Sequence, residues 1–170
     1  RSKFDRAQSI GLRHLSEHER LGRTLFNGRA GCVQCHSFPF FDSTKPTNNG
    51  LEIDYKDKGV ATLTEKTTDQ GMFKTPSLRN IEVTGPYMHD GRFKTLDEVV
   101  EFYNEKIQPH DQLDESFRKT VKWDGVPVSK REPIRLELNK QERDAVVAFM
   151  KTLTDYPLLH DDRFSDPFKK

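Results

Sequence analysis

Residues 32–36 read Cys-Val-Gln-Cys-His, and this pentapeptide decides how the chain is expected to fold. Cys32 and Cys35 are the two cysteines of the whole chain. A C-x-x-C-H string is the attachment signature of a c-type haem, in which each thiol adds to a vinyl group and the histidine ligates the iron. The motif therefore predicts one covalent haem c, with Cys32 and Cys35 as thioether anchors and His36 as the proximal iron ligand.

Two other interpretations of this pentapeptide fit less well. A structural zinc site needs four ligands, and the chain has no second pair of cysteines. A dithiol redox pair is expected in a β-α-β unit, whereas the residues on both sides of the motif are typical of a polar loop and a helix. Because haem attachment would use both thiols, no disulfide is expected.

The composition indicates a single polar domain over residues 1–170. Of the 170 residues 33% are hydrophobic, and the mean hydropathy is −0.84. A covalent haem would supply part of the core that this composition lacks. The 28 basic and 27 acidic residues leave a net charge of +1, which argues against nucleic acid or a membrane surface as a partner. No apolar run of about 18 residues is present, so no membrane span is predicted.

The chain begins Arg1-Ser2-Lys3, without an initiator methionine or a signal peptide, and we expect a processed or cleaved product. Haem is normally attached to cysteines outside the cytoplasmic membrane, so we expect a periplasmic or otherwise extracytoplasmic protein. Residues 1–15 and 156–170 read as an N-terminal and a C-terminal arm of the domain.

Three helix starts share one capping pattern. In each, a Ser, Thr or Asn stands three residues before a Glu whose carboxylate can return a hydrogen bond to the backbone. The pairs are Ser16 with Glu19, Thr95 with Glu98, and Asn139 with Glu142. With apolar residues at helical spacing, they predict helices over 17–26, 96–106 and 140–153, and a short fourth helix is expected over 114–121. The stretch 37–94, rich in turn residues, predicts irregular loop that wraps the haem edge.

Several sequence blocks stand in a characteristic order around the haem motif. They read LGRTLF (21–26), NGL (49–51), TPSLRN (75–80), GPYMHDG (85–91), TLDEVV (95–100) and VAFMKTL (147–153). With these blocks, nearly the whole chain resembles the C-terminal domain of the bacterial di-haem cytochrome c peroxidase and MauG family. The resemblance implies a mostly α fold: a cytochrome c-like helical domain wrapped around one covalent haem, with long irregular loops.

The resemblance also implies a function. In that family a second, N-terminal haem reacts with peroxide, and the C-terminal haem stores or relays electrons. Because this chain has one C-x-x-C-H, the peroxide-reacting haem would lie on another polypeptide or in a missing N-terminal half. We therefore expect an electron- or hole-relaying domain of a peroxidase or MauG-like oxidoreductase, with little turnover when isolated. Its partners would be that second haem-bearing domain or chain and a redox partner protein.

The sixth iron ligand is the next question. By the same resemblance, the position late in the helix after the H-D-G block is a Met in the peroxidase branch and a Tyr in the MauG branch, and here it is Tyr103. A phenolate would favour ferric iron and higher oxidation states, whereas a thioether favours ferrous iron. The rival interpretation is that Tyr103 fills an apolar helix face. Met72, Met88 and Met150 are competing ligands, of which Met88 and Met150 read as packing.

Four further residues complete the predicted site. Arg79 would bind a haem propionate through its guanidinium. His89 would bond a propionate, tune the haem pocket or cap its own turn. The family also binds a calcium ion between its domains, which here would use the backbone carbonyls of Thr84 and Pro86, although another ligand comes from the missing domain.

Two other functions stay open. One is a stand-alone monohaem electron carrier with a His/Met haem and no catalytic step, and the other is a subunit whose haem is one link of a multi-haem chain. Trp123, the only tryptophan, reads as a structural or interface residue, and His110 reads as solvated among charged neighbours. The sequence does not identify a substrate pocket.

Overall fold

The computed structural model describes residues 1–120, 125–166 and 168, and in them the chain is mostly helical. The helices are α1 (Lys3–Ile10), α2 (Glu17–Asn27), α3 (Ala61–Thr64), α4 (Leu96–Glu101), α5 (Lys140–Lys151) and α6 (Tyr156–Leu159). Strands β1 (Pro46–Thr47) and β2 (Phe73–Lys74) pair antiparallel, with Pro46 opposite Lys74. Loops and single helical turns connect these elements, so the predicted mostly α class with long irregular loops is confirmed.

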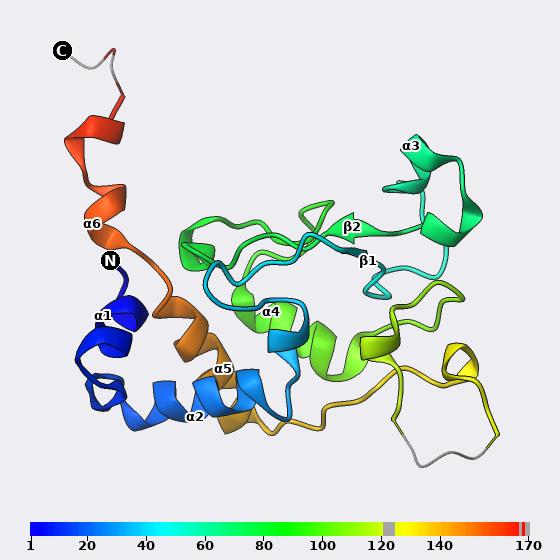
Figure 1. Ribbon diagram of the computed structural model, residues 1–170, viewed down its shortest axis with the longest axis horizontal. Coiled ribbons are helices and arrows are strands. Elements are labelled where there is room, and N and C mark those ends of the chain that lie inside the picture. Colours follow the sequence, from blue (N-terminus) through cyan, green and yellow to red (C-terminus); the bar gives the residue numbers. More distant parts are fainter. Residues whose placement is uncertain (121–124, 167, 169–170) are drawn as a thin grey trace.

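Helices α2 and α5 lie side by side along one edge of the molecule (Figure 1). They approach closely because Gly22 of α2 faces α5, where an added Cβ would lie 1.8 Å from the carbonyl oxygen of Ala145. The buried rings of Phe26 and Phe149 meet there with their centroids 5.2 Å apart. They belong to what we name the α2–α5 cluster, an apolar core that also includes Phe4, Leu25, Phe41, Leu96, Val100, Val146, Met150 and Leu153.

A second apolar core is separate from the first. We name it the loop cluster, because most of its side chains come from the loops: Leu51, Tyr55, Phe102, Ile107 and Leu113, with Phe73, Met88, Phe93, Tyr103, Phe117 and Ile134 partly buried around them. Helix α4 connects the two cores, since Leu96 and Val100 pack in the α2–α5 cluster while Phe102, just after its end, packs in the loop cluster. The domain therefore has two cores rather than one.

The three predicted capping boxes are present at the starts of α2, α4 and α5. The helix predicted over 96–106 is present with these bounds, but its winding changes: α4 ends at Glu101, and Phe102–Lys106 continue it as a wider π turn. The predicted helix over 114–121 is a single 3-10 turn, Glu115–Phe117, after which Arg118 is extended and pairs with Pro133. Its predicted end at Val121 lies outside the described residues.

The N-terminal segment contains a helix that the sequence analysis did not predict. Ser2 and Asp5 form a capping box at the start of α1, and the buried Phe4 and Ala7 anchor this helix in the α2–α5 cluster. The capping-box pattern that predicts the other helix starts is present here too, with Asp5 in the position that Glu occupies in the other three boxes. At the other end, the segment that starts with α6 runs away from the helices towards the C-terminus (Figure 1).

Candidate functional site

The C-x-x-C-H motif follows α2 as a tight turn. Gly31 has a left-handed backbone (φ 67°), which starts the 3-10 turn Cys32–Gln34, and the backbone N–H of His36 donates to the carbonyl of Cys32 at 2.9 Å. Residues three apart lie on the same side of a 3-10 turn. The local fold therefore places the Cys32 and Cys35 side chains on one face.

Both thiols are unpaired and partly buried. Burial raises the pKa of Cys32 to about 12 and also raises the pKa of Cys35. The reactive form of a redox cysteine is the thiolate, so these raised values do not fit a dithiol redox pair. Among the described residues, no group of three or more His, Cys, Asp or Glu side chains is arranged to hold a metal ion. His14 and His18, although four residues apart, thus do not complete a zinc site with the cysteines.

The imidazole of His36 is fixed in one orientation. Its Nδ1 lies 2.9 Å from the carbonyl oxygen of Phe41, and because a carbonyl only accepts, Nδ1 carries the hydrogen. Burial lowers the pKa of His36 and outweighs the hydrogen bonds to the carbonyls of Phe41 and Pro76, so the neutral ring is favoured. With the hydrogen on Nδ1, Nε2 carries the lone pair, the arrangement that metal-ligating histidines use.

Tyr103 lies on the π turn after α4, at the edge of the loop cluster. Its hydroxyl oxygen accepts a hydrogen bond from Nδ2 of Asn49 at 3.0 Å, and the same nitrogen lies 3.7 Å from the sulfur of Met88. The ring stacks on Phe117, with centroids 5.7 Å apart and an interplanar angle of 18°. Burial raises the pKa of Tyr103 to about 12, although the bond from Asn49 opposes the rise.

Asn104, the residue after Tyr103, fixes the π turn. Its side chain is fully buried, and it accepts from the backbone N–H of Leu138 at 2.8 Å and donates to the carbonyl of Leu138 at 3.3 Å. The backbone carbonyl of Asn104 accepts from the N–H of Leu136 at 2.9 Å. The segment before α5 therefore holds the turn that presents Tyr103.

The C-x-x-C-H turn and Tyr103 belong to opposite cores and influence each other. Cys32 packs against the α2–α5 cluster, whereas Tyr103 and Met88 pack against the loop cluster. Negative charge on Cys32 or Cys35 would add to the rise in the pKa of Tyr103, which burial causes first. Two thiols on one face, a neutral imidazole with a free Nε2 and apolar walls from two separate cores fit a c-type haem.

Arg79 already has protein partners. Its guanidinium pairs with Asp5 at 2.8 Å, donates twice to the carbonyl of Pro39 and lies over the ring of Phe41. Burial alone would raise the pKa of Asp5, but hydrogen bonds from Arg79 and Ser2 outweigh it and lower the pKa to about 2. These contacts connect α1 to the loop after the haem motif, and the predicted propionate contact of Arg79 stays a prediction.

The other predicted residues lie on the surface of the loops. His89 is exposed and stacks on Phe73, with centroids 3.9 Å apart and an interplanar angle of 12°. Thr84 and Pro86 are exposed on both sides of a cis Gly85-Pro86 bond. Their roles towards haem and calcium stay predictions.

Of the other candidate ligands, Met150 is buried in the α2–α5 cluster, and the backbone of Met72 pairs with Gly59. Met88 alone of the three methionines shares a hydrogen-bond donor with Tyr103. Trp123 lies outside the described residues.

Sequence reasoning missed two polar contacts of the loops, that of Asn49 with Tyr103 and that of His110 with Asn48. Asn49 appeared only within the NGL block, and His110 was predicted to be solvated. In the structure His110 is half-buried, and its Nδ1 accepts from the backbone N–H of Gln112 at 3.0 Å and lies 3.2 Å from Nδ2 of the buried Asn48. No local pattern reveals these partners, because His110 and Asn48 are far apart in the sequence.

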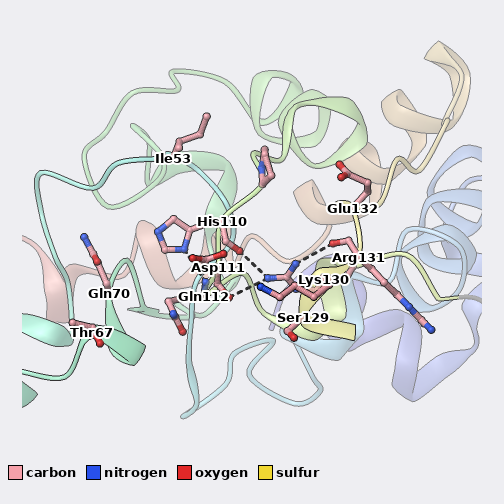
Figure 2. A pocket seen from close by; sticks show the side chains of 12 residues that line it. Ile53, Thr67, Gln70, His110, Asp111, Gln112, Ser129, Lys130, Arg131 and Glu132 are labelled. Carbon is pink, nitrogen blue, oxygen red and sulfur yellow. Dashed lines mark hydrogen bonds between the residues drawn. The ribbon is translucent and has the colours of Figure 1, made fainter. Parts of the chain in front are cut away.

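A polar cavity of about 640 Å³ lies beside His110. Figure 2 shows His110 and Gln112 beside Gln70 on one side, and Arg131 and Glu132 on the other. The buried Arg118 closes it by donating to the carbonyls of His110, Leu113 and Arg131. The residues that line this cavity do not include Cys32, His36 or Tyr103, so it is distinct from the candidate haem site.

In the part of the chain that the structure describes, no helix is both long and apolar enough to cross a bilayer. A mostly helical fold with a C-x-x-C-H turn on one core and a partly buried phenol on the other defines the class of the protein, a cytochrome c-like domain.

Comparison with known proteins then identifies the family. The chain is 33% identical to cytochrome c peroxidase IdrP1 of Denitromonas iodatirespirans, over 95% of this chain and 47% of that protein. It is 31% identical to the methylamine utilization protein MauG of Paracoccus denitrificans, over 95% of this chain and 49% of that protein. A solved MauG-like protein associated with microbial copper homeostasis matches with a TM-score of 0.77 and 32% identity, over 99% of this chain and 52% of that chain.

These likenesses place the chain in the family of bacterial cytochrome c peroxidases and MauG proteins. No protein-family profile matches it. The chain spans about half the length of the curated relatives it matches.

Proposed function

We propose that this chain is a c-type haem domain that relays electrons or holes within a di-haem peroxidase or MauG-like oxidising enzyme. Cys32 and Cys35 would hold the haem through thioether bonds, His36 would be the proximal ligand and Tyr103 the distal ligand. The observation that carries the proposal is the position of these groups: Cys32 of the motif packs on the α2–α5 cluster, the phenol of Tyr103 packs on the loop cluster, and helix α4 connects the two cores.

A haem bound here would supply one-electron redox chemistry. The chain's own residues would tune it. The carbonyl of Phe41 holds the Nδ1 hydrogen of His36 and so directs Nε2 towards the proximal position. Asn104 holds the π turn, and Phe117 covers one face of Tyr103, so the phenol is presented in one orientation. Both axial positions would then be occupied, and peroxide would have no place to bind.

The peroxide-reacting haem would therefore be elsewhere. The matched relatives are about twice as long as this chain, which supports a second haem-bearing domain or chain as the principal partner. A redox partner protein would complete the route of electrons. An extracytoplasmic location follows from the haem attachment. We keep a calcium ion at the carbonyls of Thr84 and Pro86, and propionate contacts of Arg79 and His89, as parts of this proposal.

The test is to mature the chain in a host that attaches c-type haem. We expect intact-mass spectrometry to show the mass of the polypeptide plus one haem. The Cys32→Ser, Cys35→Ser double variant should show the mass of the polypeptide alone. Resonance Raman spectra of the ferric protein should show phenolate modes that vanish in Tyr103→Phe. A bare peptide mass would refute haem binding, and a phenolate-free spectrum would refute the distal ligand alone.

One observation favours the second candidate, a monohaem electron carrier with a His/Met haem. The sulfur of Met88 contacts the same amide nitrogen as the Tyr103 hydroxyl, so a thioether is close to the proposed distal ligand. A weak long-wavelength Met-to-iron band that persists in Tyr103→Phe and is lost in Met88→Leu would support that function.

A further inference from the structure

Asn49 lies between the two side chains that compete for the distal position. Its Nδ2 is 3.0 Å from the hydroxyl oxygen of Tyr103 and 3.7 Å from the sulfur of Met88. An amide nitrogen carries two hydrogens, so Asn49 can donate to both atoms at once. Oxygen and sulfur are thereby held side by side, at the edge of the loop cluster.

The backbone around Asn49 is fixed from both sides. The preceding Asn48 is fully buried, and its Oδ1 accepts from the N–H of Gly50 at 2.8 Å and from the hydroxyl of Tyr55 at 3.1 Å. Nδ2 of Asn48 donates to the carbonyl of Gln70 at 3.0 Å. A residue between a buried, fully bonded side chain and a buried glycine has little freedom to turn away.

The block that carries Met88 is tied to the same loop. Arg92 pairs with Asp90 at 2.6 Å and with Glu52, and it donates to the carbonyl of Leu51 at 3.4 Å. Arg92 therefore connects residues 51–52 to Asp90, next to the segments that carry Asn49 and Met88.

The two acceptors differ in what they gain from the amide. A phenol oxygen that ligates iron carries negative charge, and a donor to a charged acceptor makes a strong hydrogen bond. A thioether sulfur is a weak acceptor and stays neutral when it ligates iron. The Asn49 amide therefore favours oxygen over sulfur as the ligand and keeps the sulfur turned towards itself.

We propose that Asn49 is a positioning residue that selects Tyr103 over Met88 as the distal ligand of the haem. This inference rests on the proposed function, because it requires the haem. It goes further in one respect: it assigns the choice of ligand to a residue that does not itself bind iron.

The experiment uses the haem-loaded protein and measures ligation rather than turnover. Asn49→Leu removes both hydrogen-bond donors at similar volume. We expect most of the sample to lose the phenolate Raman modes and to gain the weak Met-to-iron band, and we expect the reduction potential to rise, because a thioether favours ferrous iron. Adding Met88→Leu to Asn49→Leu should abolish the new band, whereas Met88→Leu alone should leave the phenolate spectrum unchanged.

A second variant and a matched control separate this effect from a folding defect. Asn49→Asp keeps the shape of the side chain but lacks the donors, and its charge opposes a phenolate, so the phenolate modes should be lost at least as completely. Asn139→Asp makes the same chemical change at the start of α5, where Asp caps as well as Asn, and should match the wild type.

An unchanged phenolate spectrum in Asn49→Leu would overturn the inference, and so would loss of the phenolate modes without a band that depends on Met88. Failure of the proposed function is distinguishable, because it would be seen in the wild type, as a missing haem mass or as a spectrum without phenolate modes before any substitution at Asn49.

Discussion

At the scale of single residues, Arg79 shows how a charged side chain can serve the fold beside a cofactor site. We expect Arg79→Ala to lower the free energy of unfolding by roughly 1–2 kcal/mol, because it removes a charge-assisted pair with Asp5 and the donors to Pro39. Urea unfolding of the haem-loaded protein measures the change, and Arg79→Lys should recover part of it by restoring the charge.

The same variants test the propionate contact predicted from the sequence. If Arg79 acts on the fold alone, the reduction potential of Arg79→Ala should equal that of the wild type. A shifted potential with unchanged stability would instead assign Arg79 to the haem.

His110 makes the stability depend on pH near neutrality. Burial lowers the pKa of folded His110 below the value of 6.5 for a free histidine. Below about pH 6.5 the His110 side chain therefore binds a proton in the unfolded chain but not in the folded chain. The contribution of His110 to the free energy of unfolding is complete above pH 6.5, and it is lost as the pH falls from there to the pKa of the folded protein. Protonation at Nδ1 would also break the bond from the N–H of Gln112.

We expect the free energy of unfolding to fall between pH 7.5 and pH 5.5 and to fall less steeply in His110→Gln. Urea titrations at the two pH values measure both slopes. Because the carboxylates with lowered pKa values, such as Asp5 and Asp114, titrate at lower pH, they should not affect this window. Equal slopes in the two proteins would contradict the assignment to His110.

The functional residues that could be predicted are those that form a short motif in the sequence. Cys32, Cys35 and His36 lie within five positions, and their turn needs only Gly31 before it. Asn49 and Asn104 had no such signal, because their partners Met88 and Leu138 are far along the chain. Their roles depend on how the loops pack, which the sequence pattern does not specify.

At the scale of elements, the close contact between α2 and α5 depends on Gly22, which has no side chain to separate the two helices. Gly22→Ala would place a Cβ 1.8 Å from the backbone oxygen of Ala145, which only a separation of the helices can relieve. Overpacking of this kind typically costs about 1–3 kcal/mol, and a backbone clash puts it at the upper end. Thermal unfolding should show a clear loss of stability in Gly22→Ala, whereas Thr24→Ala on the exposed face of α2 should change it little. Equal stability of both variants would disprove close packing at Gly22.

The helix starts could be predicted because a capping box is local, but the change from α to π winding after Glu101 could not. Apolar spacing continues past Glu101, whereas the chain widens into the π turn, in which Asn104 bonds to the backbone of Leu138. We expect Asn104→Leu to leave the backbone N–H of Leu138 without its acceptor, at a cost of about 1–3 kcal/mol, and to weaken the phenolate spectrum of Tyr103. Urea unfolding and resonance Raman spectra of the same sample measure both. A stability loss with an unchanged spectrum would show that the π turn does not orient Tyr103.

At the scale of the whole molecule, two small apolar cores with the proposed haem between them make the low apolar content of the chain compatible with a fold. Helix α4 links the α2–α5 cluster to the loop cluster, and the proposed haem would lie between Cys32 on one and Tyr103 on the other. The α2–α5 cluster is built from helices with their own caps. The loop cluster is built from irregular segments, which have little local stability when their apolar faces are not covered.

The Cys32→Ser, Cys35→Ser double variant without haem should therefore lose structure unevenly. Hydrogen exchange measured by mass spectrometry should show peptides from 46–60, 84–94 and 107–118 exchanging about tenfold faster or more than in the haem-loaded protein, equivalent to roughly 1.4 kcal/mol. Peptides from α2 and α5 should keep most of their protection, because Phe26 and Phe149 still pack on each other. Loss of protection at one uniform rate across both sets would show that the domain unfolds as a single unit and that the haem does not join two separate cores.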